Sequence, residues 1–306
     1  MPRRDVGLAT LVILVWGVNF VAAKIAMESL DPLLMAALRF ALVALPAVFF
    51  VSRPRMGFWP VLASGLTMGA LQFGLLYTGM VLGMPAGLAS LVLQVQTLFT
   101  VVIAAMVLRE RPDRAQVVGI LIGLLGMAVV GAQYVAGAPA LPFLLCIAAA
   151  ASWACGNVIT RRHPPRSGFS LVVWSALVPP IPLLLASFWL EGSPASAWAA
   201  VEQVSLRSLG GLAFIAYGAS MLGYGIWNLL LSRHSAATVA PWSMFVPVIG
   251  AGAAWLYDGE VPTPLGVLGA AITVVGVLLA LGVGNRALRS RQDRPDPTPH
   301  TEPPGM

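Results

Sequence analysis

One stretch of the sequence, MGFWPVLASGLTMGALQFGLLYTGMVLGMPAGLASLVLQVQTLFTVVIAAMVL, occupies residues 56–108 and contains no charged side chain. A helix that crosses a membrane needs about 20 predominantly apolar residues, so this stretch is long enough for two such helices. The segment Gly83-Met84-Pro85 near its middle is typical of a turn. The stretch therefore predicts two membrane-spanning helices joined by a short connection.

Long apolar intervals continue on both sides of this stretch. Hydrophobic residues make up 58% of the 306 positions and charged residues 10%, whereas a soluble domain carries about 25% charged residues. Two further spans fit in residues 115–160, and one fits in each of the intervals 6–27, 33–51, 167–190, 208–232, 234–257 and 261–285. The sequence therefore predicts an all-α integral membrane protein with ten transmembrane helices.

The arginines between the predicted helices indicate the topology. If the N-terminus is cytoplasmic, every arginine outside the predicted spans lies on the cytoplasmic side, except Arg207. Cytoplasmic loops retain Lys and Arg, so this distribution predicts that both termini are cytoplasmic. The net charge of +6 then reflects topology. We therefore expect the lipid bilayer as a partner, and no nucleic acid.

The chain also repeats itself. Residues 83–130 align with residues 233–280 without a gap, and within this alignment Gly119 falls on Gly269. We call this pairing, extended upstream, the repeat register. Ten helices in two copies give five helices per copy, and an odd number inverts the second copy in the membrane. Inverted repeats are the architecture of alternating-access carriers, whose substrate site lies near the midplane between the halves.

This repeat predicts the domain organisation. We expect a first five-helix repeat over residues 1–136 and a second, inverted one over residues 137–285. Residues 286–306 are rich in Pro and charged residues, so we expect them to form a disordered cytoplasmic tail.

Polar and aromatic side chains share one face of the first predicted helix. At 100° per residue, Trp16, Asn19 and Lys24 fall within an arc of about 140°. The sixth predicted helix repeats the pattern with Trp153 and Asn157. The asparagine amides could bind a substrate amine or carboxylate, or could form hydrogen bonds between helices. Lys24 could face the substrate or extend to the membrane interface.

Arg39 lies inside the second predicted helix, where a charge is costly unless it has a partner. Its guanidinium could bind a substrate carboxylate through two hydrogen bonds, or form an ion pair within the bundle. Trp174-Ser175 occupies the equivalent place in the second repeat. We therefore expect an asymmetric site.

Aromatic and amide side chains lie within other predicted spans. They are Tyr77, Tyr224 and Trp227, together with Gln72 and Gln94. They could line an amphiphilic pocket in which the rings hold an ammonium group, or they could serve helix packing. The sequence contains no metal-ligand cluster, nucleophile motif or phosphate-binding loop. We therefore expect no enzyme activity, no metal and no cofactor.

The acidic residues bear on energy coupling. All 12 of them fall in predicted loops, helix ends or the tail. Proton-driven exporters often use a carboxylate inside the membrane. The sequence therefore predicts no coupling carboxylate. This leaves facilitated diffusion, exchange, or proton coupling through Lys24, the only lysine, and we expect downhill efflux or exchange that needs no proton gradient.

Several short motifs are shared with a known family. They are Trp16-Gly17-Val18-Asn19-Phe20, Leu38-Arg39-Phe40, residues 83–94, residues 152–157, residues 174–177, residues 223–227, Val239-Ala240-Pro241 and Phe245-Val246-Pro247. Through them the chain resembles the EamA family of the drug/metabolite transporter superfamily over nearly all of residues 5–285.

This resemblance implies a ten-helix inverted repeat in the inner membrane of a bacterium. It also implies export of small amino-acid metabolites, such as cysteine or O-acetylserine, by alternating access. Related proteins carry other substrates on the same scaffold, so other amino acids, amphiphilic cations and sugars are alternatives. A non-transporting membrane interaction protein is a further alternative. The oligomeric state is left open between a monomer and a homodimer.

Overall fold

The computed structural model describes residues 1–132, 140–259, 261 and 263–282. All regular structure in this part of the chain is helical, which confirms the predicted all-α fold. The elements in chain order are α1 (Arg3–Ala26), α2 (Pro32–Ala44), η1 (Ala47–Phe49), α3 (Phe58–Gly65), η2 (Leu66–Leu71), α4 (Gln72–Val81), α5 (Ala86–Val92), η3 (Leu93–Val95), α6 (Gln96–Leu108), α7 (Arg114–Gly131), α8 (Ala140–Arg162), α9 (Gly168–Ser175), α10 (Pro180–Leu190), α11 (Pro194–Glu202), α12 (Leu206–Ala213), η4 (Phe214–Tyr224), α13 (Gly225–Arg233), α14 (Ala236–Val239), η5 (Ala240–Phe245), α15 (Val246–Asp258) and α16 (Pro264–Ala280).

Most of these helices are long and apolar enough to cross a membrane. Among the described residues, eight helical stretches qualify, and a ninth is formed if α9 and α10, which meet at a bend of 44°, count as one span. The apolar helix α16 has 17 residues, which is about the lower limit for crossing the hydrocarbon core. A multi-pass membrane fold is therefore confirmed, and it is consistent with the predicted count of ten spans.

The backbone repeats its irregularities in the repeat register. The third membrane segment of each half contains a π-helical stretch, η2 in the first half and η4 in the second. The residues that end α6 and α15, Arg109 and Gly259, are repeat counterparts, and both are left-handed, with φ of 56° and 73°. The expected boundary between residues 136 and 137 and the expected tail at residues 286–306 lie outside the described residues.

Helices α7 and α16 meet through glycines in a reciprocal way. A Cβ atom added at Gly119 would lie 2.5 Å from the carbonyl oxygen of Gly276, and one added at Gly269 would lie 2.6 Å from that of Gly126. The repeat register pairs Gly119 with Gly269 and Gly126 with Gly276, so it converts each contact into the other. A contact that maps onto itself indicates a two-fold relation between the halves. The packing therefore supports an inverted repeat.

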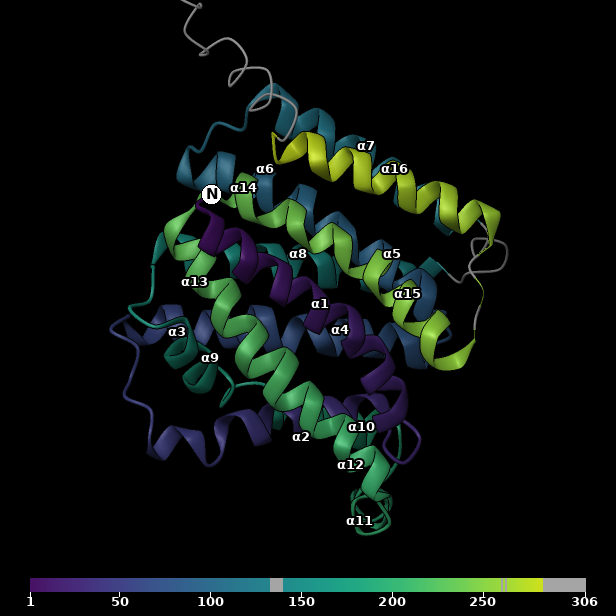
Figure 1. Ribbon diagram of the computed structural model, residues 1–306. Coiled ribbons are helices and arrows are strands. Elements are labelled where there is room, and N and C mark those ends of the chain that lie inside the picture. The colour runs from purple at the N-terminus through teal and green to yellow at the C-terminus, as the bar shows by residue number, and fades with distance from the viewer. Residues whose placement is uncertain (133–139, 260, 262, 283–306) are drawn as a thin grey trace, which may run out of the picture.

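The other large helix contacts follow the same relation. α1 packs against α15, and α8, its counterpart in the second half, packs against α6. In Figure 1, α7 and α16 lie side by side along one edge, and α15 lies between this pair and α1. The first turn of α1 and the last turns of α6, α8 and α13 share one end of the molecule. We call this the arginine-rich end, and we call the opposite end the distal end.

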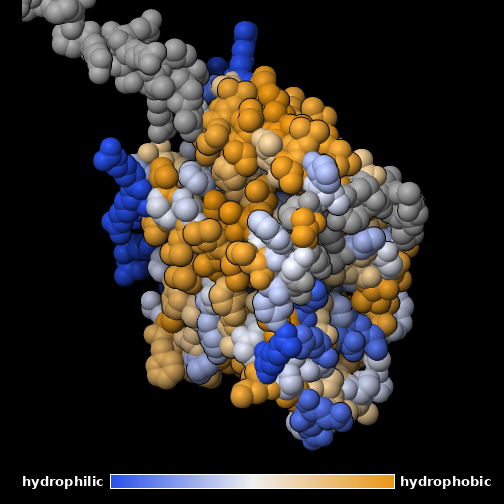
Figure 2. Space-filling model, turned by 45° about the vertical axis from the view of Figure 1, so that its right-hand side comes forward, coloured by the Kyte–Doolittle hydropathy of each residue, from blue (hydrophilic) through white to orange (hydrophobic). Residues whose placement is uncertain are grey.

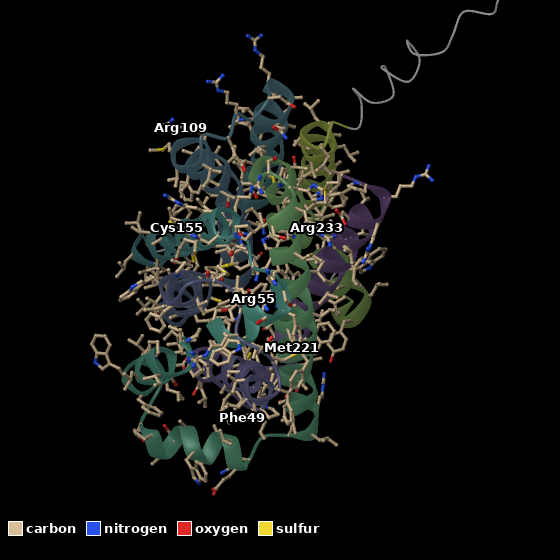
Figure 3. The ribbon with its side chains drawn as sticks, turned by 90° about the vertical axis from the view of Figure 1, so that its left-hand side faces the viewer. Phe49, Arg55, Arg109, Cys155, Met221 and Arg233 are labelled. Atoms are coloured by element: carbon tan, nitrogen blue, oxygen red, sulfur yellow. The ribbon has the colours of Figure 1, made fainter. Side chains whose placement is uncertain are left out.

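Figure 3 looks onto the arginine-rich end, where Arg55 precedes α3, Arg109 follows α6 and Arg233 ends α13. The sides of the molecule are apolar. Figure 2 shows hydrophobic side chains gathered over its upper part, with hydrophilic ones at the left edge and the lower end. Strongly exposed apolar side chains include Phe49, Phe50, Trp59, Met106, Trp189 and Leu256. Such a surface suits contact with lipid.

Candidate functional site

A cavity of about 850 Å³ lies among α1, α4, α7, α15 and α16. Its lining includes Lys24 and Met80 near the distal ends of α1 and α4, and Val261 and Thr263 between α15 and α16. The cavity therefore extends to the distal end of the molecule. Its volume falls within the roughly 300–1,000 Å³ that small-molecule sites occupy.

The cavity brings together most of the residues that the sequence predicts for substrate binding. The predicted residues in its lining are Trp16, Asn19, Lys24, Arg39, Tyr77, Gln94, Trp153 and Tyr224. Asn157 and Trp227 are not part of the lining. Both lie behind it and are buried, with 1% and 0% of their surface exposed. Residues on five or more helices thus converge on one space, as a site between two halves requires.

Arg39 on α2 is the charged group at the inner part of this cavity. Only 2% of its surface is exposed. Its Nε atom donates a hydrogen bond to Ser220 Oγ, and the guanidinium carbon lies 4.5 Å from the centre of the Phe73 ring and 5.7 Å from that of Tyr224. Among the described residues, no carboxylate forms an ion pair with it. The cavity therefore contains a buried cation whose remaining N–H donors can take an anion.

An aromatic cluster on four helices closes the inner limit of the cavity. Trp16 lies at its centre, with ring-centre distances of 5.6 Å to Trp153, 5.3 Å to Tyr224 and 5.1 Å to Trp227. The indole N–H of Trp16 donates to the carbonyl oxygen of Ala219 at 3.0 Å. The contacts to Trp153 and Tyr224 are edge-to-face, an arrangement that stabilises aromatic pairs. These contacts hold the Trp16 ring in one orientation, in which it forms part of the inner wall of the cavity.

The two repeated asparagines have different surroundings. Asn157 accepts a hydrogen bond from Trp227 Nε1 at 2.9 Å and donates one to Thr100 Oγ1 at 3.2 Å, so it joins α8 to α13 and α6. Asn19 lines the cavity, and its buried Oδ1 has no donor in the part of the chain that the structure describes. Asn157 therefore has the bonding of a structural residue, whereas Asn19 has acceptor capacity left for a ligand.

Partly buried ion pairs close the arginine-rich end. Asp5 on α1 is 5% exposed, and its carboxylate lies 2.6 Å from His234 Nε2 and 3.2 Å from Arg233 Nη1. After α6, Glu110 accepts hydrogen bonds from Arg161 Nε at 2.8 Å and from the backbone N–H of Ala236 at 2.9 Å. These contacts tie α1 to α13, and the end of α6 to α8 and α14.

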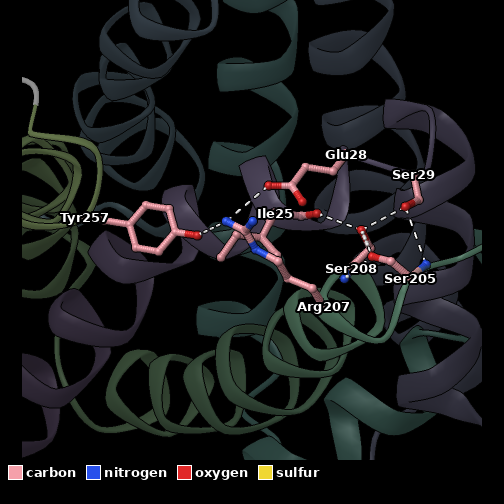
Figure 4. Close-up of polar contacts among 7 residues, drawn as sticks. All are labelled: Ile25, Glu28, Ser29, Ser205, Arg207, Ser208 and Tyr257. Carbon is pink, nitrogen blue, oxygen red and sulfur yellow. Dashed lines mark hydrogen bonds and ion pairs between the residues drawn. The ribbon is translucent and has the colours of Figure 1, made fainter.

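The distal end is held by more exposed contacts. Arg207 forms an ion pair with Glu28 at 3.3 Å and a hydrogen bond with the Tyr257 hydroxyl, as Figure 4 shows. The two charged side chains are 59% and 43% exposed. Ser208 Oγ donates to the carbonyl oxygen of Ile25 at 3.0 Å. Exposed ion pairs contribute little stability, so the end onto which the cavity opens has the weaker closure.

The sequence did not single out three residues that matter here. Phe73 lies under Arg39, Ser220 accepts its hydrogen bond, and Gln96 lines the cavity while 7% exposed. Gln96 could have been found from its polar amide inside an apolar span. Phe73 and Ser220 gain their meaning only from tertiary contact with Arg39. No group of three metal-ligating side chains occurs in the described residues.

Comparisons with known proteins give the same picture. The model of the EamA-like transporter family matches residues 5–132 and 140–282. Two relatives, from Salmonella typhimurium and Escherichia coli, are both named "Probable amino-acid metabolite efflux pump". Each is 42% identical over 288 residues, which covers 91% of this chain and 95% of the relative. A solved structure titled "Crystal structure of protein" aligns with a TM-score of 0.69 over 94% of this chain and 99% of that chain, at 20% identity.

Proposed function

The chain belongs to the EamA-like transporter family, and on that premise we propose that it exports small amino-acid metabolites through the cavity described above. It is a multi-pass membrane transporter and not an enzyme. The relatives at 42% identity are named for efflux of amino-acid metabolites, and identity at that level extends over nearly the whole chain. Cysteine and O-acetylserine are the substrates to test first.

Arg39 is the observation that carries this proposal. A buried guanidinium that faces a cavity without a carboxylate partner among the described residues is matched by a ligand that brings its own carboxylate. Every amino-acid metabolite with a free α-carboxyl group meets this requirement. Amphiphilic cations would be repelled by Arg39, and neutral sugars would leave its charge uncompensated. The geometry thus favours amino-acid metabolites over the other substrate classes.

The remaining site residues would contact the rest of the substrate. Trp16, Trp153 and Tyr224 offer aromatic surface, and Asn19 offers an amide. Asn157 and Trp227 would act behind this surface by holding the cluster together. Lys24 lies near the mouth of the cavity, where it would meet the substrate on its way through.

The placement in the membrane is part of the proposal. With the arginine-rich end in the cytoplasm of a bacterial cell, loop arginines would obey the positive-inside tendency and both termini would be cytoplasmic. The cavity would then face outward. Alternating access requires a second state in which the arginine-rich end opens, and an inverted repeat provides one by exchanging the conformations of the two halves.

Counterflow into proteoliposomes tests this function. Liposomes that contain the purified protein and unlabelled cysteine should take up labelled cysteine, and competition by O-acetylserine, a sugar and a cationic dye should rank the substrate classes. Arg39→Gln should lower the initial rate about 100-fold, since it removes the charged partner of a buried ion pair. Arg55→Gln, an exposed arginine outside the cavity, is the control and should leave the rate unchanged. Transport of only the dye or the sugar, or full activity of Arg39→Gln, would contradict the proposal.

A further inference from the structure

Three glutamines present unused hydrogen-bond acceptors to the cavity. Gln72, Gln94 and Gln96 all belong to its lining, and only 4%, 3% and 7% of their surfaces are exposed. The amide oxygen of each is buried and has no donor in the described part of the protein, and the same holds for Asn19 Oδ1. Native proteins pair the large majority of buried polar atoms, so a group of acceptors around one cavity calls for an explanation.

The backbone places Gln94 and Gln96 on the same cavity. In a regular α-helix, residues two positions apart differ by about 200° and face nearly opposite sides. Gln94 lies within the 3₁₀ turn η3 and Gln96 directly follows it. Three residues complete a 3₁₀ turn, so the angle between the directions of the two side chains narrows to about 120°. The Nε2 atom of Gln94 donates to the carbonyl oxygen of Ser90 at 3.3 Å, which leaves its amide oxygen as the atom available to a ligand.

The chemistry of this group is complementary to that of Arg39. Unpaired amide oxygens accept hydrogen bonds and attract a cation, whereas the guanidinium donates hydrogen bonds and attracts an anion. An ammonium group carries three N–H donors and a positive charge, so it satisfies several such oxygens at once. The cavity therefore offers separate partners for the two charged groups of a zwitterion.

The three glutamines all come from the first half of the chain. In the repeat register, their counterparts in the second half are apolar, namely Leu222 for Gln72, Met244 for Gln94 and Val246 for Gln96. Helix packing does not require the amides, since the second half forms the equivalent segments without them. A role toward a ligand explains this difference.

We propose that the amide oxygens of Gln72, Gln94 and Gln96, together with that of Asn19, bind the ammonium group of the substrate while Arg39 binds its carboxylate. This assignment rests on the proposed export function and adds a substrate requirement to it. The transporter selects α-amino acids against analogues of the same size and carboxylate that lack the amine.

Paired compounds test the assignment. L-Cysteine and 3-mercaptopropionate differ only in the α-amino group, so the ratio of their inhibition constants in counterflow isolates its contribution. Gln94→Met and Gln72→Leu install the residues found at the repeat counterparts. Each substitution should raise the inhibition constant of cysteine about tenfold, because a hydrogen bond to a charged group is lost. The inhibition constant of 3-mercaptopropionate should stay unchanged. Gln94→Glu keeps the acceptors and should retain the preference for cysteine. Gln203→Met, at an exposed position, is the matched control.

The outcomes separate this assignment from the export function. An unchanged ratio in both glutamine variants means that the amides bind only water, and it overturns the assignment while export stands. Equal weakening of both compounds, accompanied by a lower melting temperature, means that the amides are structural, and it overturns the assignment as well. Binding to the detergent-purified protein, followed through intrinsic tryptophan fluorescence to which the cavity residues Trp16 and Trp153 contribute, gives the same ratio without flux. If the wild-type protein binds cysteine more tightly than 3-mercaptopropionate but transports neither compound, the export function is refuted and the assignment stands.

Discussion

The first and second halves of this transporter have the same scaffold and different cavity chemistry. Both halves contain a π-helical stretch in their third membrane segment, and both end their fourth segment on a left-handed residue. Yet Arg39 and the cavity-lining amides belong to the first half, whereas the second half contributes mainly aromatic and aliphatic side chains. The comparison teaches that symmetry is retained in the contacts between the halves and is lost in the lining of the proposed substrate site.

This division follows from what each part must do. A carrier with inverted repeats needs two halves that can adopt each other's conformation, so the contacts between them must be equivalent. A small zwitterion has two chemically different ends and no two-fold axis. A site with equal halves would leave one of its ends next to the wrong partner. Substitutions at paired positions can therefore separate the scaffold from the site.

The glycine contacts between α7 and α16 provide the largest expected effect on stability. Gly126→Ala would place its Cβ 2.4 Å from Thr273 Oγ1, and its counterpart Gly276→Ala would place one 2.3 Å from the backbone nitrogen of Gly123. Both should destabilise the protein by about 1–3 kcal/mol, because helix backbones must move apart. Melting temperatures of the purified variants in detergent measure the loss.

If the scaffold is symmetric, Gly126→Ala and Gly276→Ala should lower the stability of the protein equally. Gly210→Ala, at a helical glycine with nothing within 4 Å of the added Cβ, serves as the control and should be neutral or slightly stabilising. If only one of the two interface variants loses stability, the contact is not shared equally and the symmetry of the scaffold is broken.

The two repeat-related asparagines should differ in what their substitution affects, stability in one case and transport in the other. Asn157→Ala leaves the Trp227 N–H buried without an acceptor and should cost about 1–3 kcal/mol of stability. Asn19→Ala removes an acceptor that has no donor among the described residues, so stability should hold while cysteine transport falls several-fold. Thermal melting and counterflow on both variants are needed. Equal loss of stability in the two would mean that both amides are structural and that the halves do not differ here.

The left-handed helix ends give the smallest expected effect. Arg109 has a φ of 56°, which costs a residue with a side chain strain that its counterpart Gly259 avoids. Arg109→Gly should therefore stabilise the protein by about 0.5–1 kcal/mol, and Gly259→Ala should destabilise it by a similar amount. Denaturation midpoints of the two variants check the signs. A destabilised Arg109→Gly would mean that contacts of the arginine side chain outweigh the strain.

Much of the fold could be predicted from local signals. Uncharged runs mark the membrane helices, and the repeat register already pairs Gly119 with Gly269 and Arg109 with Gly259. The match of the family model confirms the family prediction. That prediction was possible because the family's motifs are short and contiguous in the chain. The break between α9 and α10 could not be predicted in the same way, because both short helices lie within one apolar run.

The candidate site was predictable in its members and not in their roles. Arg39 and Asn19 stand out because polar groups inside apolar helices are rare. Asn157 has the same sequence signal as Asn19, and only the positions of Trp227 and Thr100 on other helices give it structural hydrogen bonds. The burial of Asp5 was also invisible, since a carboxylate at a helix end normally faces water and here meets His234 instead.

In the proposed orientation, the ion pairs at the arginine-rich end would set the rate of the transport cycle. Opening the arginine-rich end requires the Asp5 carboxylate to leave His234 and Arg233, and Glu110 to leave Arg161, so the empty carrier would dwell in the outward-facing state. Return to the cytoplasmic side would then be the slow step. Substrate outside would shorten that step, because it would bind the outward-facing carrier and be transported back with it. One-for-one exchange should therefore run faster than net release, and loss of label from preloaded vesicles should accelerate when unlabelled cysteine is added outside.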